Sequence, residues 1–196
     1  ELSQKIDEVK DTFKQYSSLL DQIEQQEFST ELLNTRQQQI MSEGKKASEI
    51  FKGFSKLIEA FDNRKNILSA VISNGFMLWD IKYTYKIEAW VAEYNGKVND
   101  WLEVVAFYDS YNSLGNYSFN KPEYIYPKIT NNETAISTKN LGHPLLLSDK
   151  RVDNDLQIDN QQFFIITGAN MAGKSTFLRT VSLHIVMANV GLPICA

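Results

Sequence analysis

The sequence predicts a chain of two halves, an all-helical first half and a mixed α/β second half. Residues 1–116 contain no proline, and their apolar side chains recur at alternating spacings of four and three, which is the period of long helices that pack in a bundle or coiled coil. Glycine, asparagine and proline then occur close together over 112–128, which indicates a linker or domain boundary, and short apolar runs follow. We therefore expect a helical domain over 1–116 and a second domain over 117–196.

Two apolar seams carry the helical prediction. The first contains Leu2, Ile6, Val9, Phe13, Tyr16, Leu20 and Ile23, and the second contains Ile87, Val91, Tyr94, Val98, Trp101, Val105 and Tyr108. Ser29 or Thr30 is expected to cap a second helix. Interruptions are predicted at Gly44, Asn63 and Asn74-Gly75, and Gly96 argues against one unbroken helix along the second seam. Trp79, Trp90 and Trp101 are eleven residues apart, so we expect them to share a packed face.

The second half reads as strand, loop and helix. Short strands are predicted at 135–137 and 156–158, and the β-branched and aromatic run 163–167 predicts a buried parallel strand. A helix is predicted over 174–190, apolar on more than one side and therefore buried against a sheet, with Gly191 and Pro193 ending it. On this helix His184 is expected to be a helix-surface or subdomain contact and not a catalytic group, and Arg179 is given no catalytic role.

Between the predicted strand and helix the chain reads G-x-x-x-x-G-K-S, the pattern of a nucleotide phosphate-binding loop. Its glycines allow successive backbone N–H groups to surround phosphate oxygens, and the helix N-terminus adds its own amides and positive dipole end. Lys174 is expected to contact the terminal phosphates and Ser175 to ligate Mg²⁺. We therefore predict ATP and Mg²⁺ as ligands, bound by Gly168, Ala169, Asn170, Met171, Ala172, Gly173, Lys174, Ser175 and Thr176.

Composition narrows the remaining functions. The net charge of −4 and the absence of a basic stripe argue against a nucleic-acid-binding surface on this piece. One cysteine and two histidines argue against a zinc site, and the single cysteine favours a reducing, cytoplasmic compartment. No run of 18 apolar residues is present. The chain opens at Glu1 inside a predicted helix, so we expect its natural start, with or without a membrane segment, to lie upstream.

Several motifs together resemble one family. The stretch from Gly168 to Thr180 is similar to the T-G-x-N-M-x-G-K-S-T-x-x-R loop of the MutS family of DNA mismatch-repair ATPases, and its Asn-Met pair is the specific part. His143-Pro144-Leu145-Leu146 looks like the H-P-L-L element of that family, and 152–155 is similar to its V-P-N-D stretch. The segment 191–196 suits its G-x-x-V-P-A, and the helical half resembles its core and lever helices.

The resemblance implies the opening of an ABC-type P-loop ATPase domain that works as a homodimer and couples ATP binding and hydrolysis to a clamp on mismatched or branched DNA, held largely by regions outside this chain. It places Asn170 near the γ-phosphate and Val152 against the adenine. Departures at Gly142, Arg151, Ala169 and Ala172 hint at a divergent branch or paralogue.

On the same resemblance, the acidic motif and the signature segment would come after Ala196, so we expect this chain to bind nucleotide without turning it over and assign no catalytic residue within it. Two alternatives stay open. One is another ABC- or SMC-type ATPase whose coiled-coil helices meet its phosphate loop. The other is a helical interaction module that carries a vestigial nucleotide site.

Overall fold

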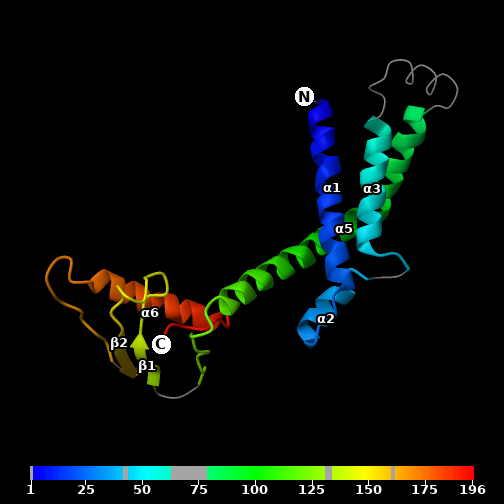
Figure 1. The fold of residues 1–196 in the computed structure, drawn as a ribbon. Coiled ribbons are helices and arrows are strands. Elements are labelled where there is room, and N and C mark those ends of the chain that lie inside the picture. Colours follow the sequence, from blue (N-terminus) through cyan, green and yellow to red (C-terminus); the bar gives the residue numbers. More distant parts are fainter. Residues whose placement is uncertain (1, 42–43, 63–78, 131–133, 160–161) are drawn as a thin grey trace. The chain divides into compact units, whose positions relative to one another are not determined.

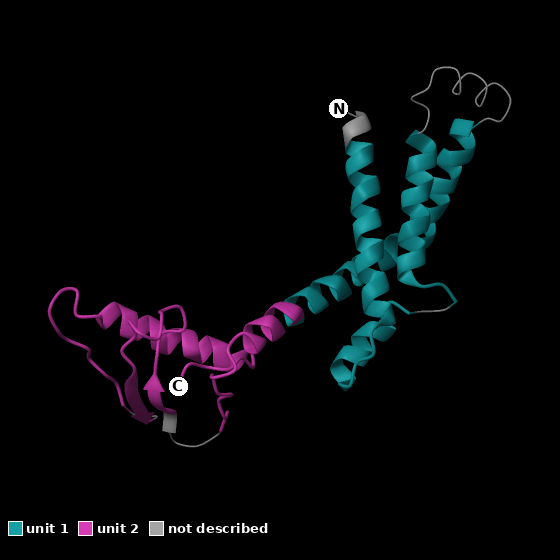
Figure 2. Ribbon diagram, in the orientation of Figure 1, with its two compact units in different colours: residues 1–111 teal, residues 112–196 magenta. Residues whose placement is uncertain are grey.

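The computed structural model describes residues 2–41, 44–62, 79–130, 134–159 and 162–196. The chain divides into two compact units, residues 1–111 and 112–196, and each is treated by itself (Figure 2). The interruptions predicted at Asn63 and Asn74-Gly75 lie outside the described residues. Within the described part, no helix is long and apolar enough to cross a membrane.

Unit 1 is helical. Its helices are α1 (Leu2–Gln25), α2 (Glu31–Gln38), α3 (Ala47–Asp62) and the first part of α5 (Trp79–Phe119). α1 and α3 pack against each other along their lengths (Figure 1). Thr30 is the N-cap residue of α2, although its side chain makes no capping hydrogen bond, and Gly44 falls in the turn before α3 with a φ of 90°. Both positions therefore lie between helices, as the sequence predicts.

The core of unit 1 consists of apolar side chains from α1, α3 and α5. Leu20, Phe51 and Val104 are fully buried, and side chains of both predicted seams pack on them. Trp101 lies with its ring 5.7 Å from that of Phe51. Such burial contributes about 1.5–3 kcal/mol for each large side chain. The seams are thus confirmed as packing surfaces over Phe13 to Ile23 and over Tyr94 to Tyr108, whereas Val9 and Val91 are exposed.

The three tryptophans serve packing, as predicted. Trp90 stacks on Phe54 with ring centroids 4.0 Å apart, and Trp101 lies deeper in the same aromatic cluster. Trp79 begins α5 and donates a hydrogen bond from Nε1 to the carbonyl of Ala60, 3.2 Å away on α3. All three therefore contribute to helix–helix contacts within unit 1.

A buried carboxylate joins α1 to the start of α3. Glu24 is 6% exposed and accepts hydrogen bonds from the backbone N–H of Ser48, at 3.0 Å, and from its hydroxyl. The Ser17 hydroxyl donates to the Ser48 carbonyl at 2.9 Å. An N–H in the first turn of a helix has no acceptor within the helix, so Glu24 supplies one from a neighbouring element.

α5 corrects two sequence predictions. It runs without a break through Gly96, where the sequence argued for an interruption, and it continues over 112–119, where a linker was expected. A glycine in a helix costs about 1 kcal/mol relative to alanine. The packing of Trp90 and Trp101 on either side of Gly96 outweighs that cost. The irregular segment therefore begins only after Phe119.

Unit 2 contains a two-stranded antiparallel sheet and one long helix. β1 (Thr134–Leu141) pairs with β2 (Asn154–Asp159), which confirms and lengthens both short predicted strands. α6 (Lys174–Asn189) matches the predicted helix, and Gly191 follows it with a φ of 78°. An isolated bridge between Ile125 and Ile194 ties the segment after α5 to the end of the chain.

The prediction of a strand over 163–167 is wrong for this structure. The segment is irregular, and Phe163 and Ile165 are 84% and 74% exposed. A β-strand needs a neighbour for its backbone hydrogen bonds, and within the described residues only β1 and β2 form a sheet.

The predicted burial of α6 is also wrong. Only Thr180, His184 and Met187 are buried on it, while three of its apolar side chains, Leu178, Ile185 and Val186, are exposed, as is Val190 directly after it. Because the sheet of unit 2 has only two strands, it is too small to cover an all-round apolar helix. The described part of the chain is thus mostly helical with a small sheet.

Candidate functional site

A cavity of about 450 Å³ lies in unit 2, and the glycine-rich loop forms one of its sides. Two stretches far apart in the sequence line it. The first runs from the end of β1 to the start of β2, and the second from the loop into α6. Its lining residues in these stretches include Leu141, His143, Leu146, Lys150, Arg151, Val152, Asn154, Ala172, Gly173, Lys174, Thr176, Phe177 and Thr180. Some of these lining residues are ones that the sequence predicts to bind a nucleotide.

The loop has the backbone shape that its glycines allow. Gly173 is the N-cap residue of α6 with a φ of 82°, a left-handed conformation that favours glycine, and Met171 adopts a φ of 64°. A Cβ at Gly173 would meet nothing within 4 Å, so the glycine is needed for its backbone conformation and not for space. As at any helix start, the first N–H groups of α6 have no acceptor within the helix itself.

Lys174 is the first residue of α6 and turns back over the loop. Its ammonium donates hydrogen bonds to the backbone carbonyls of Gly168 and Ala169. This places a positive charge at the helix N-terminus, where the helix dipole also favours a negative ligand. The combination of cation, free amides and glycine turn is suited to an anion.

The predicted site residues divide into two groups. Ala172, Gly173, Lys174, Thr176 and Val152 line the cavity together. The other predicted residues lie in the same loop or at the start of α6 but are not among the lining residues: Gly168, Ala169, Asn170, Met171 and Ser175. All five are exposed, and Met171 is fully so.

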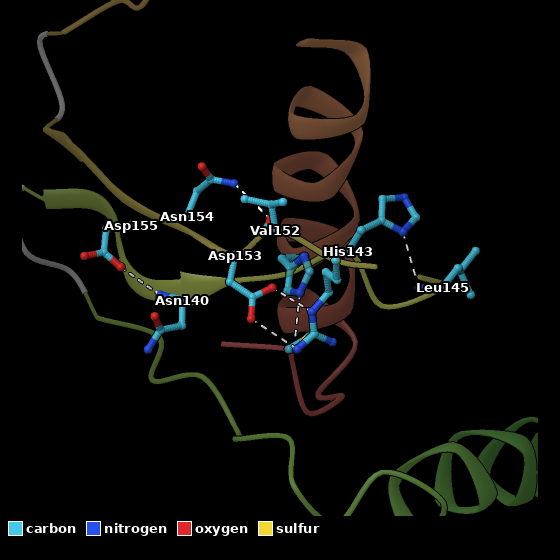
Figure 3. A network of polar contacts seen from close by, with 10 residues as sticks. Asn140, His143, Leu145, Val152, Asp153, Asn154 and Asp155 are labelled. Carbon is cyan, nitrogen blue, oxygen red and sulfur yellow. Dashed lines mark hydrogen bonds and ion pairs between the residues drawn. The ribbon is translucent and has the colours of Figure 1, made fainter. Parts of the chain in front are cut away.

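The stretch between β1 and β2, which lines part of the cavity, contains an ion pair. Arg151 donates from Nε to Oδ1 of Asp153 at 2.6 Å and from a terminal nitrogen to Oδ2 at 3.2 Å. The bond to Asp153 is the main cause that raises the pKa of the Arg151 guanidinium. Beside the pair, Val152 is 80% exposed, and its carbonyl accepts from the Asn154 amide at 3.1 Å (Figure 3).

His143 lines the cavity next to this wall. Its Nδ1 accepts a hydrogen bond from the backbone N–H of Leu145 at 3.3 Å, which closes the turn after β1 (Figure 3). The side chain is half-buried. From the sequence alone His143 is most simply a turn residue, and the structure gives it both a turn contact and a place in the cavity wall.

His184 holds α6 to the C-terminal segment behind the cavity. Its ring is 5% exposed, Nδ1 lies 2.7 Å from the Thr180 carbonyl, and Nε2 accepts from the backbone N–H of Cys195 at 3.2 Å. Burial is the main cause that lowers the pKa of His184. These contacts require a neutral ring with its proton on Nδ1. Of the two positions expected for His184, the structure excludes the helix surface, because the ring is buried in a contact within unit 2.

The Cys195 segment also contacts the base of the cavity wall. The Cys195 carbonyl accepts from the Gly142 N–H at 2.9 Å, and its thiol interacts with the Tyr124 hydroxyl. Burial is the main cause that raises the pKa of Tyr124 to about 12. The hydroxyl is therefore neutral at physiological pH, and this part of unit 2 is structural.

No group of three or more His, Cys, Asp or Glu side chains that could hold a metal ion occurs among the described residues.

The sequence missed the polar half of the cavity. Lys150, Arg151 and Asn154 line the cavity, yet none stands in a motif whose spacing predicts that position. Only the similarity of the stretch 152–155 to a family element pointed to this segment. Nearness of 141–154 to the loop depends on the fold and not on sequence distance.

Comparison with known proteins supports the resemblance to the MutS family. Residues 164–196 match the family model of MutS domain V. The chain is 32% identical over 135 residues to the DNA mismatch repair protein MutS of Lachnoclostridium phytofermentans, covering 65% of this chain and 14% of that protein. It is 36% identical over 104 residues to the MutS of Pseudothermotoga lettingae, covering 51% of this chain and 13% of that protein.

A fungal relative gives the same result. The DNA mismatch repair protein msh3 of Emericella nidulans is 29% identical over 141 residues, which is 69% of this chain and 12% of that protein. No solved structure matches the chain. The chain belongs to the MutS family. It spans about one seventh of the length of these relatives.

Proposed function

We propose that unit 2 binds the phosphates of ATP together with Mg²⁺. The observation that carries this proposal is the meeting of the glycine turn, Lys174 and the N-terminus of α6 at the side of one cavity. Its volume of about 450 Å³ lies in the range of small-ligand sites, about 300–1,000 Å³. The residues present therefore fit a nucleoside triphosphate.

Each residue has a definite part in this proposal. Phosphate oxygens would replace the carbonyls of Gly168 and Ala169 as acceptors of the Lys174 ammonium, because a charged acceptor makes a stronger hydrogen bond. The backbone N–H groups from Gly173 to Thr176 would donate to the same phosphates. Ser175 would supply a hydroxyl ligand to Mg²⁺, which neutralises charge on the phosphates when bound.

The proposal extends to the fold of the region. We assign 117–196 to the beginning of a P-loop ATPase domain of the ABC type and 1–116 to the core and lever helices before it. The match of 164–196 to MutS domain V supports this assignment.

For the whole protein we propose a MutS-like ATPase that acts on mismatched or branched DNA, forms a dimer through its ATPase domain and relays ATP binding through its helices to a DNA clamp. The names of the relatives, all DNA mismatch repair proteins, support this proposal. A vestigial nucleotide site in a helical interaction module is the competing function, and it predicts no binding of ATP.

Calorimetric titration of the chain with ATP and Mg²⁺ tests the proposal. Lys174→Ala is expected to weaken binding about thirtyfold, because a charge-assisted hydrogen bond contributes about 2 kcal/mol. Lys139→Ala removes the same side chain from an exposed position on β1 away from the cavity, and is expected to leave binding unchanged. Absence of ATP binding by the unsubstituted chain, or equal loss in both variants, would contradict the proposal.

A further inference from the structure

His184 joins the two stretches of chain that line the cavity. Its ring is 5% exposed, and Nδ1 lies 2.7 Å from the carbonyl of Thr180, a lining residue on α6. Its Nε2 accepts from the backbone N–H of Cys195 at 3.2 Å. The Cys195 carbonyl accepts from the N–H of Gly142 at 2.9 Å, and both chain neighbours of Gly142 line the cavity. These three hydrogen bonds, here called the His184 bridge, therefore run from the α6 side of the cavity to the β1 side.

The His184 bridge requires a neutral imidazole ring. A carbonyl only accepts hydrogen bonds, so the ring proton lies on Nδ1 against Thr180, and Nε2 keeps the lone pair that the Cys195 N–H needs. A second proton, on Nε2, would place two N–H donors against each other. The main-chain acceptor that Cys195 offers to such a proton is its carbonyl, which already accepts from Gly142. Protonation of His184 therefore breaks the bridge at Cys195 or at Gly142.

The titratable groups around the ring favour its neutral form. From the segment between β1 and β2, His143 and Arg151 face the ring, and a positive charge on either opposes one on His184. From the C-terminal segment comes Cys195, whose thiol interacts with the hydroxyl of Tyr124. Burial is the largest cause that lowers the pKa of His184, the two basic groups lower it further, and contacts with neighbouring backbone raise it. The ring is thus neutral near pH 7 and takes up a proton only on acidification.

We propose that the His184 bridge makes nucleotide binding by unit 2 sensitive to protons. With the ring neutral, the two sides of the cavity are held together; with the ring charged, they are no longer held together and the affinity for ATP falls. This inference rests on the proposed function, because it concerns regulation of the same site. His184 is not among the lining residues and acts through Cys195 and Gly142, so it is a positioning residue.

Direct charge attraction predicts the opposite sign. A positive charge on His184 would attract the phosphates of a bound nucleotide, so acidification would then strengthen binding. In the proposed role acidification weakens binding, because the charged ring has lost the lone pair on Nε2 that the Cys195 N–H needs. The sign of the pH dependence therefore separates a positioning role from an electrostatic one.

Calorimetric titration with ATP and Mg²⁺ at about pH 7.5 and about pH 5.5, on either side of the ordinary pKa of histidine, tests the proposal. Three variants are compared with the unsubstituted chain. His184→Gln offers an amide oxygen as acceptor and does not titrate, and His184→Ala removes the bridge. Cys195→Ala keeps the backbone groups of the bridge and removes the thiol, so it is the matched control. Phosphate groups titrate in the same range, so all four proteins are compared at the same pH.

The unsubstituted chain and Cys195→Ala are expected to lose about fivefold in affinity at the lower pH relative to His184→Gln, which is the usual size of one net hydrogen bond. At the higher pH, His184→Gln is expected to bind ATP as the unsubstituted chain does, and His184→Ala about fivefold more weakly. Amide-resolved NMR of the chain without nucleotide is expected to show Gly142 and Cys195 shifting together, with the midpoint of the His184 titration. The same spectra show whether each variant is folded.

Several results would overturn the inference while the proposed function stands. These are equal pH dependence of ATP binding in the unsubstituted chain and His184→Gln, binding that strengthens on acidification relative to His184→Gln, and a Gly142 resonance that does not follow the titration of His184. Unchanged affinity in a folded His184→Ala at the higher pH would overturn it too; if that variant does not fold, His184→Gln and the NMR titration decide. Absence of ATP binding by the unsubstituted chain at both pH values would reject the proposed function and this inference with it.

Discussion

Unit 1 and unit 2 place their large apolar side chains differently. In unit 1, three helices bury Leu20, Phe51 and Val104 completely, and aromatic rings fill the space around them. In unit 2, the segment 163–165 and much of α6 leave apolar side chains exposed, while polar groups gather around a cavity. The difference indicates that packing of an apolar core organises unit 1, whereas unit 2, for which we propose a nucleotide site, keeps many of its apolar side chains exposed.

The largest expected loss of stability, and the first test of this difference between the units, lies at the centre of the unit 1 core. Phe51→Ala is expected to lower the free energy of unfolding of unit 1 by about 4 kcal/mol, because it removes a fully buried ring and leaves a cavity. Denaturant titration followed by tryptophan fluorescence measures this, since Trp90 and Trp101 report on the same cluster. The matched change Phe119→Ala, at a side chain 83% exposed, is expected to cost about 0.5 kcal/mol or less.

Phe51→Ala also tests whether the two units are independent of each other. If unit 2 is organised by its own contacts, ATP binding by Phe51→Ala stays as in the unsubstituted chain under conditions where unit 1 is unfolded. Loss of ATP binding together with unit 1 would show that the two units are not independent in this respect.

A smaller loss of stability is expected at Glu24, the buried carboxylate that accepts from Ser48 at the start of α3. Glu24→Ala removes both acceptors that Ser48 uses and leaves a buried N–H unpaired, at a cost of about 2 kcal/mol. Glu24→Gln keeps one acceptor oxygen and is expected to cost less. Glu27→Ala, at an exposed position just after α1, provides the control in denaturant titration. Equal stability of Glu24→Ala and Glu27→Ala would contradict the role of the buried carboxylate.

The smallest expected effect is a pH dependence in unit 2. Burial lowers the pKa of His184 in the folded state, so the unfolded state takes up a proton first as pH falls. Stability from the neutral ring is complete above about pH 6.5 and is lost as pH falls toward the lowered pKa, by at most about 1.4 kcal/mol per pH unit.

Thermal unfolding of unit 2 measured from pH 8 to pH 5 tests this sign. His184→Gln is expected to flatten the dependence. Stability that increases on acidification would contradict the assigned neutral ring, because it would mean that the folded state binds the proton more tightly.

Local patterns in the sequence predicted the parts of the fold that depend on them. The seam from Leu2 to Ile23 predicted α1, and the turn residues Gly191 and Pro193 marked the end of α6. Such patterns failed where packing outweighs propensity: α5 continues through Gly96 because tryptophans on both sides are held by the core. They failed also at 163–167, because the composition of a strand does not provide the neighbour with which it must pair.

The candidate site likewise has one part that the sequence predicted and one part that it did not. The phosphate loop is one continuous stretch whose spacing carries its chemistry, so Lys174 and Gly173 were identified from the sequence and are found at the cavity. The place of Arg151 in the wall depends on its ion pair with Asp153 and on its side chain crossing Gly142, directly after β1. No spacing rule in a single sequence encodes such a contact.

The most direct test of the central claim is amide-resolved NMR of the chain titrated with ATP and Mg²⁺. Our account predicts resonance shifts at 168–180 and at 141–154, the two stretches that line the cavity, with unit 1 unchanged. Lys174→Ala is expected to suppress the shifts at both stretches. Shifts centred in unit 1, or shifts at the loop that survive Lys174→Ala, would contradict the assignment of the nucleotide site.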